Sequence, residues 1–179
     1  DAQALMSQQE SDLGTGQDVN PRVYQQEIKV RTEQGTELAA TLFSPQHGRI
    51  KSAVVIAPAT GVKRRFYTAF AQHLVAHGFA VMTFDNSGIG DSLSVPLKQS
   101  TTRLQHWGQV DMPAILSALM QRFPDTTYHL IGHSAGGQLI GLMPNAHHLS
   151  SVFNYASSSG SLRNMRDWFR LQAHFFMRC

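Results

Sequence analysis

The chain has 179 residues, a length typical of one domain, and 42% of them are hydrophobic, which is enough to fill a core. Charged residues make up 15%, which argues against a disordered polyelectrolyte, and the apolar run at 53–59 is far shorter than the ~20 residues of a membrane span. The net charge of +3 arises within 161–179, because residues 1–160 hold 11 cationic and 11 acidic side chains. We interpret this basic segment as a solvated helix face or a covered surface, with phosphate binding as the weaker alternative, and expect no nucleic-acid partner.

The cysteine content and the N-terminus bear on the compartment. The single cysteine, Cys179, excludes an internal disulfide and any CxxC metal or redox site. The N-terminus lacks the charged stretch and apolar block of a secretory signal. We therefore predict a cytoplasmic protein without an integral membrane segment.

Apolar patterns divide the chain into elements. Residues 1–22 are rich in Gln, Ser, Asp and Gly and are predicted to form a flexible leader. The predicted strands lie at 24–32, 37–43, 52–57, 79–84, 127–131 and 151–156. The predicted helices lie at 66–77, 103–123, 135–143 and 162–177. In the predicted helix at 103–123, Pro113 follows Asp111 and Met112, which indicates a restart or a kink.

The order of the elements predicts the fold class. The first two strands flank a turn at 33–36 and are expected to form a β-hairpin. The later strands are continuous apolar runs that alternate with helices, a pattern typical of a parallel sheet buried on both faces. We predict an α/β core over 23–160, and interpret 161–179 as the start of a cap or lid helix.

A G-x-S-x-G motif lies between a predicted strand and a predicted helix. It runs Gly132-His133-Ser134-Ala135-Gly136. This context is typical of a nucleophile elbow, a strained turn from which a reactive serine protrudes. We expect glycine on either side of the serine because a Cβ there would collide with neighbouring backbone.

Two backbone amides are candidates for an oxyanion hole. The N–H of Ala135 directly follows the candidate nucleophile and begins a helix, where free N–H groups favour negative charge. A second donor is expected from the loop at 58–62, after an earlier central strand. We nominate the Thr60 N–H, with Gly61 as the alternative; an ordinary strand-to-helix turn is the competing interpretation.

These motifs together resemble a known superfamily. The chain is similar to the α/β-hydrolases, and most similar to predicted bacterial hydrolases of the serine aminopeptidase and monoacylglycerol-lipase-like branch. The resemblance covers about 23–160 and rests on PATGVKRRFY (58–67), FDNSGIGDS (84–92) and LIGHSAGGQLIGL (130–142). It implies Ser134 as nucleophile and Thr60 and Ala135 as oxyanion donors. Many relatives have His-Gly where this chain has Pro-Ala at 58–59. This difference affects what the resemblance implies about the detailed geometry of the oxyanion loop, but not what it implies about the fold.

Several other polar residues have ordinary structural interpretations. Asp85 begins a DxxGxGxS loop that lacks the spacing of a phosphate-binding loop, so we expect Asp85 to order that turn. His133 is expected to be packed or hydrogen-bonded rather than to bear on substrate. His147 and His148 are adjacent and point in different directions, so no metal site is predicted.

Two further groups of side chains leave alternatives open. The cations at 63–65 could attract anionic substrates, but a solvated turn is the favoured interpretation. The aromatic residues of the last predicted helix could line an acyl pocket or could pack in the core. They are Trp168, Phe169, Phe175 and Phe176.

A catalytic acid and base are missing from the expected places. After Ser134 the only carboxylate side chain is Asp167 and the only histidine beyond it is His174. Both lie on one predicted helix, seven residues apart, so they are too distant for a hydrogen bond. We therefore expect the sheet to lack its last strands, the triad acid and His to be absent from this chain, and the isolated chain to be inactive.

These features together predict a serine hydrolase that cleaves ester, thioester or amide bonds of a small-molecule acyl substrate without a cofactor or metal. The alternative is a non-catalytic domain of the same fold that serves in binding or assembly. A nucleotide-binding module is disfavoured because phosphate-loop motifs are lacking.

Overall fold

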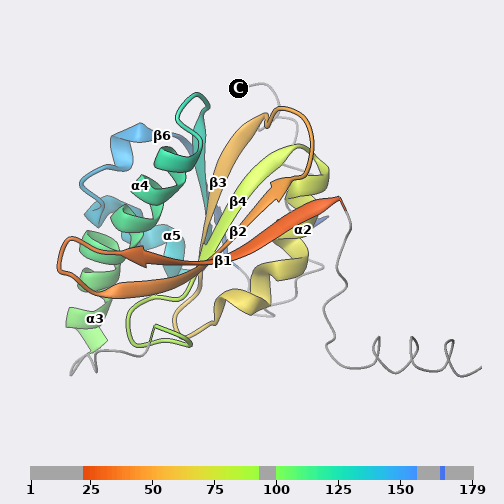
Figure 1. Cartoon of the computed structure of the whole chain (residues 1–179). Helices are drawn as coiled ribbons and strands as arrows, with labels where there is room; N and C mark the ends of the chain where they lie inside the picture. The colour runs from red at the N-terminus through yellow and green to blue at the C-terminus, as the bar shows by residue number, and fades with distance from the viewer. Residues whose placement is uncertain (1–21, 93–99, 157–165, 168–179) are drawn as a thin grey trace, which may run out of the picture.

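Six strands form one sheet in the order β1-β2-β4-β3-β5-β6 (Figure 1). The computed structural model describes residues 22–92, 100–156 and 166–167. The strands are β1 (Val23–Arg31), β2 (Glu37–Pro45), β3 (Ser52–Ala57), β4 (Phe79–Phe84), β5 (Tyr128–His133) and β6 (Leu149–Tyr155). All six predicted strands are present, and the two at 52–57 and 79–84 begin and end at the predicted residues.

The first two strands form the predicted hairpin. They pair antiparallel, and the turn between them closes with a hydrogen bond from the Thr32 N–H to the Thr36 carbonyl (2.8 Å). β2 also pairs antiparallel with β4, whereas β4 with β3, β3 with β5, and β5 with β6 are parallel. The prediction of a mainly parallel α/β sheet with an N-terminal hairpin is therefore confirmed.

The central strands are apolar on both faces because helices cover both sides of the sheet. Val54 and Ile56 pack in the cluster that contains α2 (Thr68–Ala76), whereas Ala53 and Val55 pack in the cluster that contains α4 (Met112–Arg122). Figure 1 shows α2 on one side of the sheet and α4 on the other. This arrangement explains why the strand sequence SAVVIA is continuously hydrophobic.

The predicted helix at 103–123 is interrupted by a π-helical turn. α3 (Ser100–His106) leads into η2 (Trp107–Asp111), and α4 follows directly. The indole N–H of Trp107 donates to the Ser87 carbonyl (2.9 Å), and the Asp111 carboxylate accepts the Ser87 N–H and O–H (2.7 and 2.9 Å). These bonds tie the wide turn to the loop after β4, and the predicted restart near Pro113 corresponds to the start of α4 at Met112.

The predicted helix at 135–143 is also shorter than expected. α5 (Ala135–Gln138) gives way to a 3-10 turn, η3 (Leu139–Leu142), because Gly136, Gly137 and Gly141 lower the helix propensity of this segment. Two further 3-10 turns, η1 (Arg64–Tyr67) and η4 (Ala146–His148), precede α2 and β6.

Some predictions concern residues that the structure does not describe. The leader predicted at 1–22 lies outside the described residues except for Arg22. Of the helix predicted at 162–177, only 166–167 is described, and both residues are helical. No described helix combines the length and the apolarity needed to cross a membrane.

Candidate active site

Ser134 occupies a strained turn between β5 and α5. Its φ of 55° and ψ of −121° make it the only residue other than glycine with a positive φ in the described part of the chain. Its side chain is exposed, and its N–H donates to the Tyr155 carbonyl at the end of β6 (2.7 Å). Such strain is costly and persists only where the surrounding contacts enforce it. The predicted strained turn is therefore present.

The glycines around Ser134 are needed for close packing. A Cβ on Gly132 would lie 2.3 Å from the Gly137 Cα, and one on Gly136 would lie 2.6 Å from the Pro58 carbonyl oxygen and 2.7 Å from that of Ala57. Contacts this short do not occur for real Cβ atoms, which confirms the predicted steric reason for both glycines. The same contacts seat the first turn of α5 on the carboxyl end of β3.

The candidate oxyanion loop follows β3 directly and forms a tight turn. The Val62 N–H donates to the Ala59 carbonyl (3.1 Å), and Gly61, with φ of 76°, is the third residue of the turn. This geometry is typical of a type II turn, which favours glycine at that position. Thr60 is exposed at its tip, beside the elbow that packs on Pro58.

A hydrogen-bonded pair of buried side chains joins this loop to the elbow. The Ala59 N–H donates to the Tyr67 hydroxyl (2.9 Å), which is also bonded to Nδ1 of His133 (2.7 Å). The prediction that His133 is packed and hydrogen-bonded is confirmed. Tyr67 was not among the predicted site residues. It ends the motif at 58–67, but its bond to His133 joins residues 66 apart in sequence, and nothing in the motif indicates that partner.

Arg64 fixes the far end of the same loop. Its side chain forms ion pairs with Asp85, Asp91 (2.9 Å) and Glu27 (2.8 Å), and its N–H donates to the Asp85 carboxylate (2.7 Å). The residue is only 8% exposed, so the prediction of a solvated turn is wrong for Arg64, although Lys63 and Arg65 beside it are exposed. Its ion pairs with carboxylates distant in sequence hold the Arg64 side chain in this buried position.

The loop after β4 is organised around one of these carboxylates. Asp85 is buried, and its Oδ2 accepts the Asp91 N–H (3.0 Å). The backbone carbonyl of Asp85 accepts the Ser92 hydroxyl (2.8 Å), and the Ser92 oxygen in turn accepts the Ala39 N–H (2.9 Å). The prediction that Asp85 orders this turn is confirmed.

A family model described as "Serine aminopeptidase, S33", a hydrolase family, matches residues 48–159. The chain belongs to this family. The match includes the candidate oxyanion loop, the loop after β4 and the elbow at Ser134. No curated protein matches the chain significantly.

Solved structures show the same fold as this member of the serine aminopeptidase family. A thermostable carboxyl esterase from Bacillus coagulans is 19% identical with a TM-score of 0.62, and the match covers 73% of this chain and 43% of the esterase. A lipase in its open form is 22% identical with a TM-score of 0.62, and the match covers 73% and 44%. A cold-adapted esterase from an Arctic intertidal metagenomic library is 16% identical with a TM-score of 0.57, and the match covers 78% and 64%. The chain thus has the α/β-hydrolase fold but spans less than two thirds of each of these proteins.

The described acidic and histidine residues after Ser134 do not complete a catalytic site in this family member. His147 and His148 directly precede β6, whereas Ser134 follows β5, so they lie at opposite ends of parallel strands. Asp167 is exposed, and His174 lies outside the described residues, as do the four aromatic residues predicted near it. Among the described residues, no three His, Cys, Asp or Glu side chains gather as a metal site would require.

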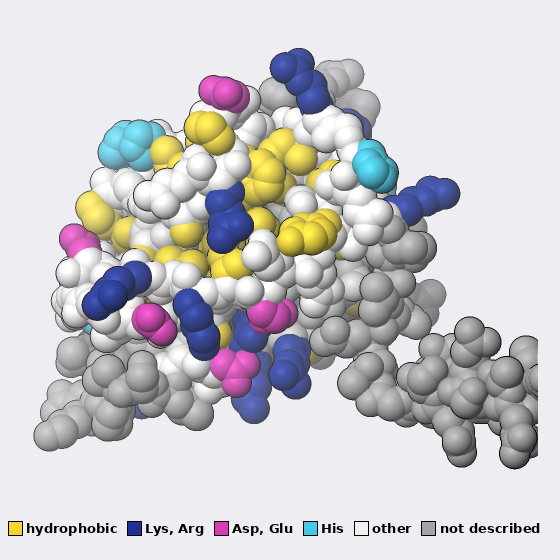
Figure 2. Space-filling view, in the orientation of Figure 1, with side chains coloured by type: hydrophobic (Ala, Val, Ile, Leu, Met, Phe, Trp, Pro, Cys, Tyr) yellow, Lys and Arg dark blue, Asp and Glu magenta, His cyan; other side chains and the backbone are white. Residues whose placement is uncertain are grey.

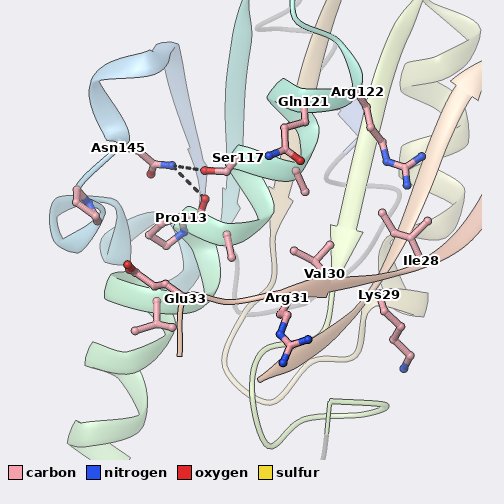
Figure 3. A pocket seen from close by; sticks show the side chains of 14 residues that line it. Ile28, Lys29, Val30, Arg31, Glu33, Pro113, Ser117, Gln121, Arg122 and Asn145 are labelled. Carbon is pink, nitrogen blue, oxygen red and sulfur yellow. Dashed lines mark hydrogen bonds between the residues drawn. The ribbon is translucent and has the colours of Figure 1, made fainter. Parts of the chain in front are cut away.

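A separate hollow of about 570 Å³ lies between β1 and α4 (Figure 3). Hydrophobic side chains gather in the middle of this side of the molecule, with charged ones around them (Figure 2). In the hollow, Ile28 and Val30 point toward α4, while Lys29 and Arg31 point away (Figure 3). The hollow contains none of the predicted site residues, and we assign no chemistry to it.

Two buried histidines make stability depend on pH. Burial lowers the pKa of both His129 and His133, so the unfolded chain binds more protons than the folded chain below pH 6.5. The free energy of unfolding is expected to be fully retained above this value. It is expected to fall with decreasing pH by up to about 1.4 kcal/mol per pH unit for each histidine.

Urea unfolding between pH 7 and pH 5 tests this expectation. Burial raises the pKa of Asp111, which acts in the opposite direction, so the informative quantity is the difference between variants. Replacing His133 with asparagine should make the pH dependence shallower, whereas replacing the exposed His147 with glutamine should not alter it. An equal slope in all three proteins would contradict the assignment.

Proposed function

We propose that this chain carries the nucleophile and the oxyanion donors of a serine hydrolase, which cleaves ester, thioester or amide bonds of small acyl substrates. The observation that supports this most is the strained, exposed backbone of Ser134 at the carboxyl end of a central strand. Family membership and the fold shared with esterases and a lipase agree with it.

The reaction follows from the elbow and the loop beside it. The Ser134 Oγ attacks the carbonyl carbon of the substrate, and its proton passes to a histidine base. The carbonyl oxygen becomes an anion, which the N–H groups of Thr60 and Ala135 stabilise. The bond to the leaving group then breaks, the protonated base supplies its proton, and water hydrolyses the acyl-enzyme. The proposed chemistry needs no metal or cofactor.

We propose that the acid and the base are not among the described residues. Among the described residues, no hydrogen bond joins the Ser134 hydroxyl to a histidine, and the Nδ1 of neighbouring His133 is engaged by Tyr67. A serine hydroxyl without a base is a weak nucleophile. We therefore expect the 179-residue chain alone to show little turnover and little labelling by a fluorophosphonate probe.

Replacing Ser134 with alanine tests the role of the nucleophile. The test uses a form of the protein that includes the acid and the base and hydrolyses 4-nitrophenyl butyrate. In that form, S134A is expected to lower kcat by about 10³-fold or more, because the covalent step is lost. The matched control is S150A, which removes an exposed hydroxyl at the other end of β6 and should leave kcat within twofold. Hydrolysis that survives S134A would refute Ser134 as the nucleophile, and the absence of any Ser134-dependent hydrolysis would favour a non-catalytic domain. Rapid probe labelling of Ser134 in the 179-residue chain would refute only the absence of its base.

A further inference from the structure

Tyr67 lies between the two segments that the proposed reaction brings together. Its side chain is fully buried, at 0% exposure, although it carries a polar hydroxyl. That hydroxyl bonds to the Ala59 N–H in the oxyanion loop and to Nδ1 of His133, the residue before the nucleophile. One oxygen atom thus joins segments that are about 70 residues apart in sequence.

The direction of each hydrogen bond can be assigned from chemistry. The Ala59 N–H can only donate, so the Tyr67 oxygen accepts there. Burial raises the pKa of Tyr67 and lowers that of His133, so the phenol keeps its proton and the imidazole is neutral near pH 7. A buried hydroxyl proton needs an acceptor, and Nδ1 of His133 is the acceptor within reach, so the Tyr67 O–H donates to Nδ1 and the imidazole proton is on Nε2. The Ala59 N–H, the Tyr67 hydroxyl and Nδ1 of His133 then each have a partner.

His133 gives this bridge a rigid attachment point. The Phe66 ring is stacked on its imidazole with an interplanar angle of 5° and centroids 6.1 Å apart, and the Tyr155 ring lies 5.6 Å away. The backbone carbonyl of the same Tyr155 accepts the Ser134 N–H. The imidazole is therefore packed among side chains that belong to the frame of the elbow.

The other end of the bridge anchors the start of the turn that carries the candidate oxyanion donor. Ala59 is the first residue of the type II turn, whose second residue is Thr60, and the turn is otherwise closed only by the bond between Val62 and Ala59. Thr60 and Gly61 at the tip of the turn are exposed, whereas Val62 at its end packs against the core. The bond to Tyr67 fixes the Pro58–Ala59 peptide plane, and the Val62 bond to the Ala59 carbonyl fixes the next plane, which carries the Thr60 N–H. Tyr67 therefore anchors the start of the turn from which the Thr60 N–H projects.

We propose that Tyr67 is a positioning residue, which sets the Thr60 oxyanion donor relative to Ser134 by bridging Ala59 and His133. This inference rests on the proposed function and adds a residue to it. Tyr67 does not touch the substrate, so it acts on transition-state stabilisation and not on substrate affinity. An oxyanion donor displaced by about 1 Å loses most of its effect.

The test compares two Tyr-to-Phe variants in the form of the protein that includes the acid and the base and whose hydrolysis of 4-nitrophenyl butyrate depends on Ser134. Y67F is expected to lower kcat about ten- to hundredfold with KM changed less than twofold, because the donor is misplaced while the buried Tyr67 itself makes no contact with the substrate. The matched control is Y128F, which removes another bonded hydroxyl at the opposite end of β5 and should leave kcat within twofold. In 15N NMR spectra of the 179-residue chain, Y67F should shift the His133 Nδ1 resonance and speed hydrogen exchange at the Ala59 amide.

A second pair of variants covers the case in which Y67F does not fold. H133N keeps an acceptor atom near the position of Nδ1, whereas H133L has none, so H133N should retain at least fivefold more kcat than H133L. Three outcomes overturn the inference: unchanged NMR signals in Y67F, a kcat for Y67F equal to that for Y128F, or equal kcat for the two His133 variants. If S134A itself leaves hydrolysis unchanged, the proposed function fails instead, whatever the Tyr67 variants show.

Discussion

Replacing Arg64 with methionine is expected to lower the free energy of unfolding by about 3–5 kcal/mol, because it leaves the Asp85 carboxylate buried without its cationic partner. The Asp85 side chain is 1% exposed, whereas those of the other two partners, Glu27 and Asp91, are 60% and 58% exposed. Solvent screens the latter two, so most of the loss comes from Asp85. Urea unfolding at pH 7 measures the change.

The neighbouring Arg65 provides the control for this prediction. It has the same chemistry and is exposed, so R65M should change the free energy of unfolding by less than about 0.5 kcal/mol. Replacing Asp85 with leucine in the R64M background removes the stranded charge and should recover part of the loss. Equal stabilities of R64M and R65M would contradict the buried cluster.

The second large effect is expected at Gly136. Replacing it with alanine places a methyl group 2.6 Å from the Pro58 carbonyl oxygen, so α5 must move away from the end of β3. We expect a loss of about 2–3 kcal/mol in the free energy of unfolding, in the range of overpacked cores. We also expect a large loss of any Ser134-dependent hydrolysis, since the elbow and the candidate oxyanion loop meet at this contact.

Gly141 is the matched control in the same segment. A Cβ there meets no atom within 4 Å, so G141A should be neutral or slightly stabilising. The test measures the thermal unfolding and the hydrolysis rates of G136A and G141A. If G136A is as stable and as active as G141A, the close approach of α5 to β3 is not a real constraint.

The parts of the fold that could be predicted from sequence are those with a local signal. The strand at 52–57 is a continuous apolar run, and the glycines around Ser134 belong to the five-residue G-x-S-x-G motif. In contrast, the π-helical turn at Trp107 depends on bonds to Ser87, twenty residues earlier. Pro113 indicated a restart or a kink of this helix, but helical periodicity contains no information about a distant partner such as Ser87, so the π-helical turn itself could not be predicted.

The candidate site shows the same division. Ser134 and its flanking glycines follow from a motif, and the loop at 58–62 follows from its place after a central strand. Arg64 was misjudged because consecutive cations at 63–65 suggest a solvated turn, while its burial depends on carboxylates at positions 27, 85 and 91. The bridge at Tyr67 joins residues that no periodic pattern relates, so only the three-dimensional structure shows it.

The hydrogen bond from the Ser134 N–H to the Tyr155 carbonyl has a consequence for the order of assembly during synthesis. The strained turn is held from one side by the end of β3, which is made early, and from the other by the end of β6, which is made about 20 residues after the serine. A nascent chain that has not yet released β6 from the ribosome lacks the second restraint. We therefore expect the strained conformation of Ser134 to form late, after the rest of the central sheet has been synthesised.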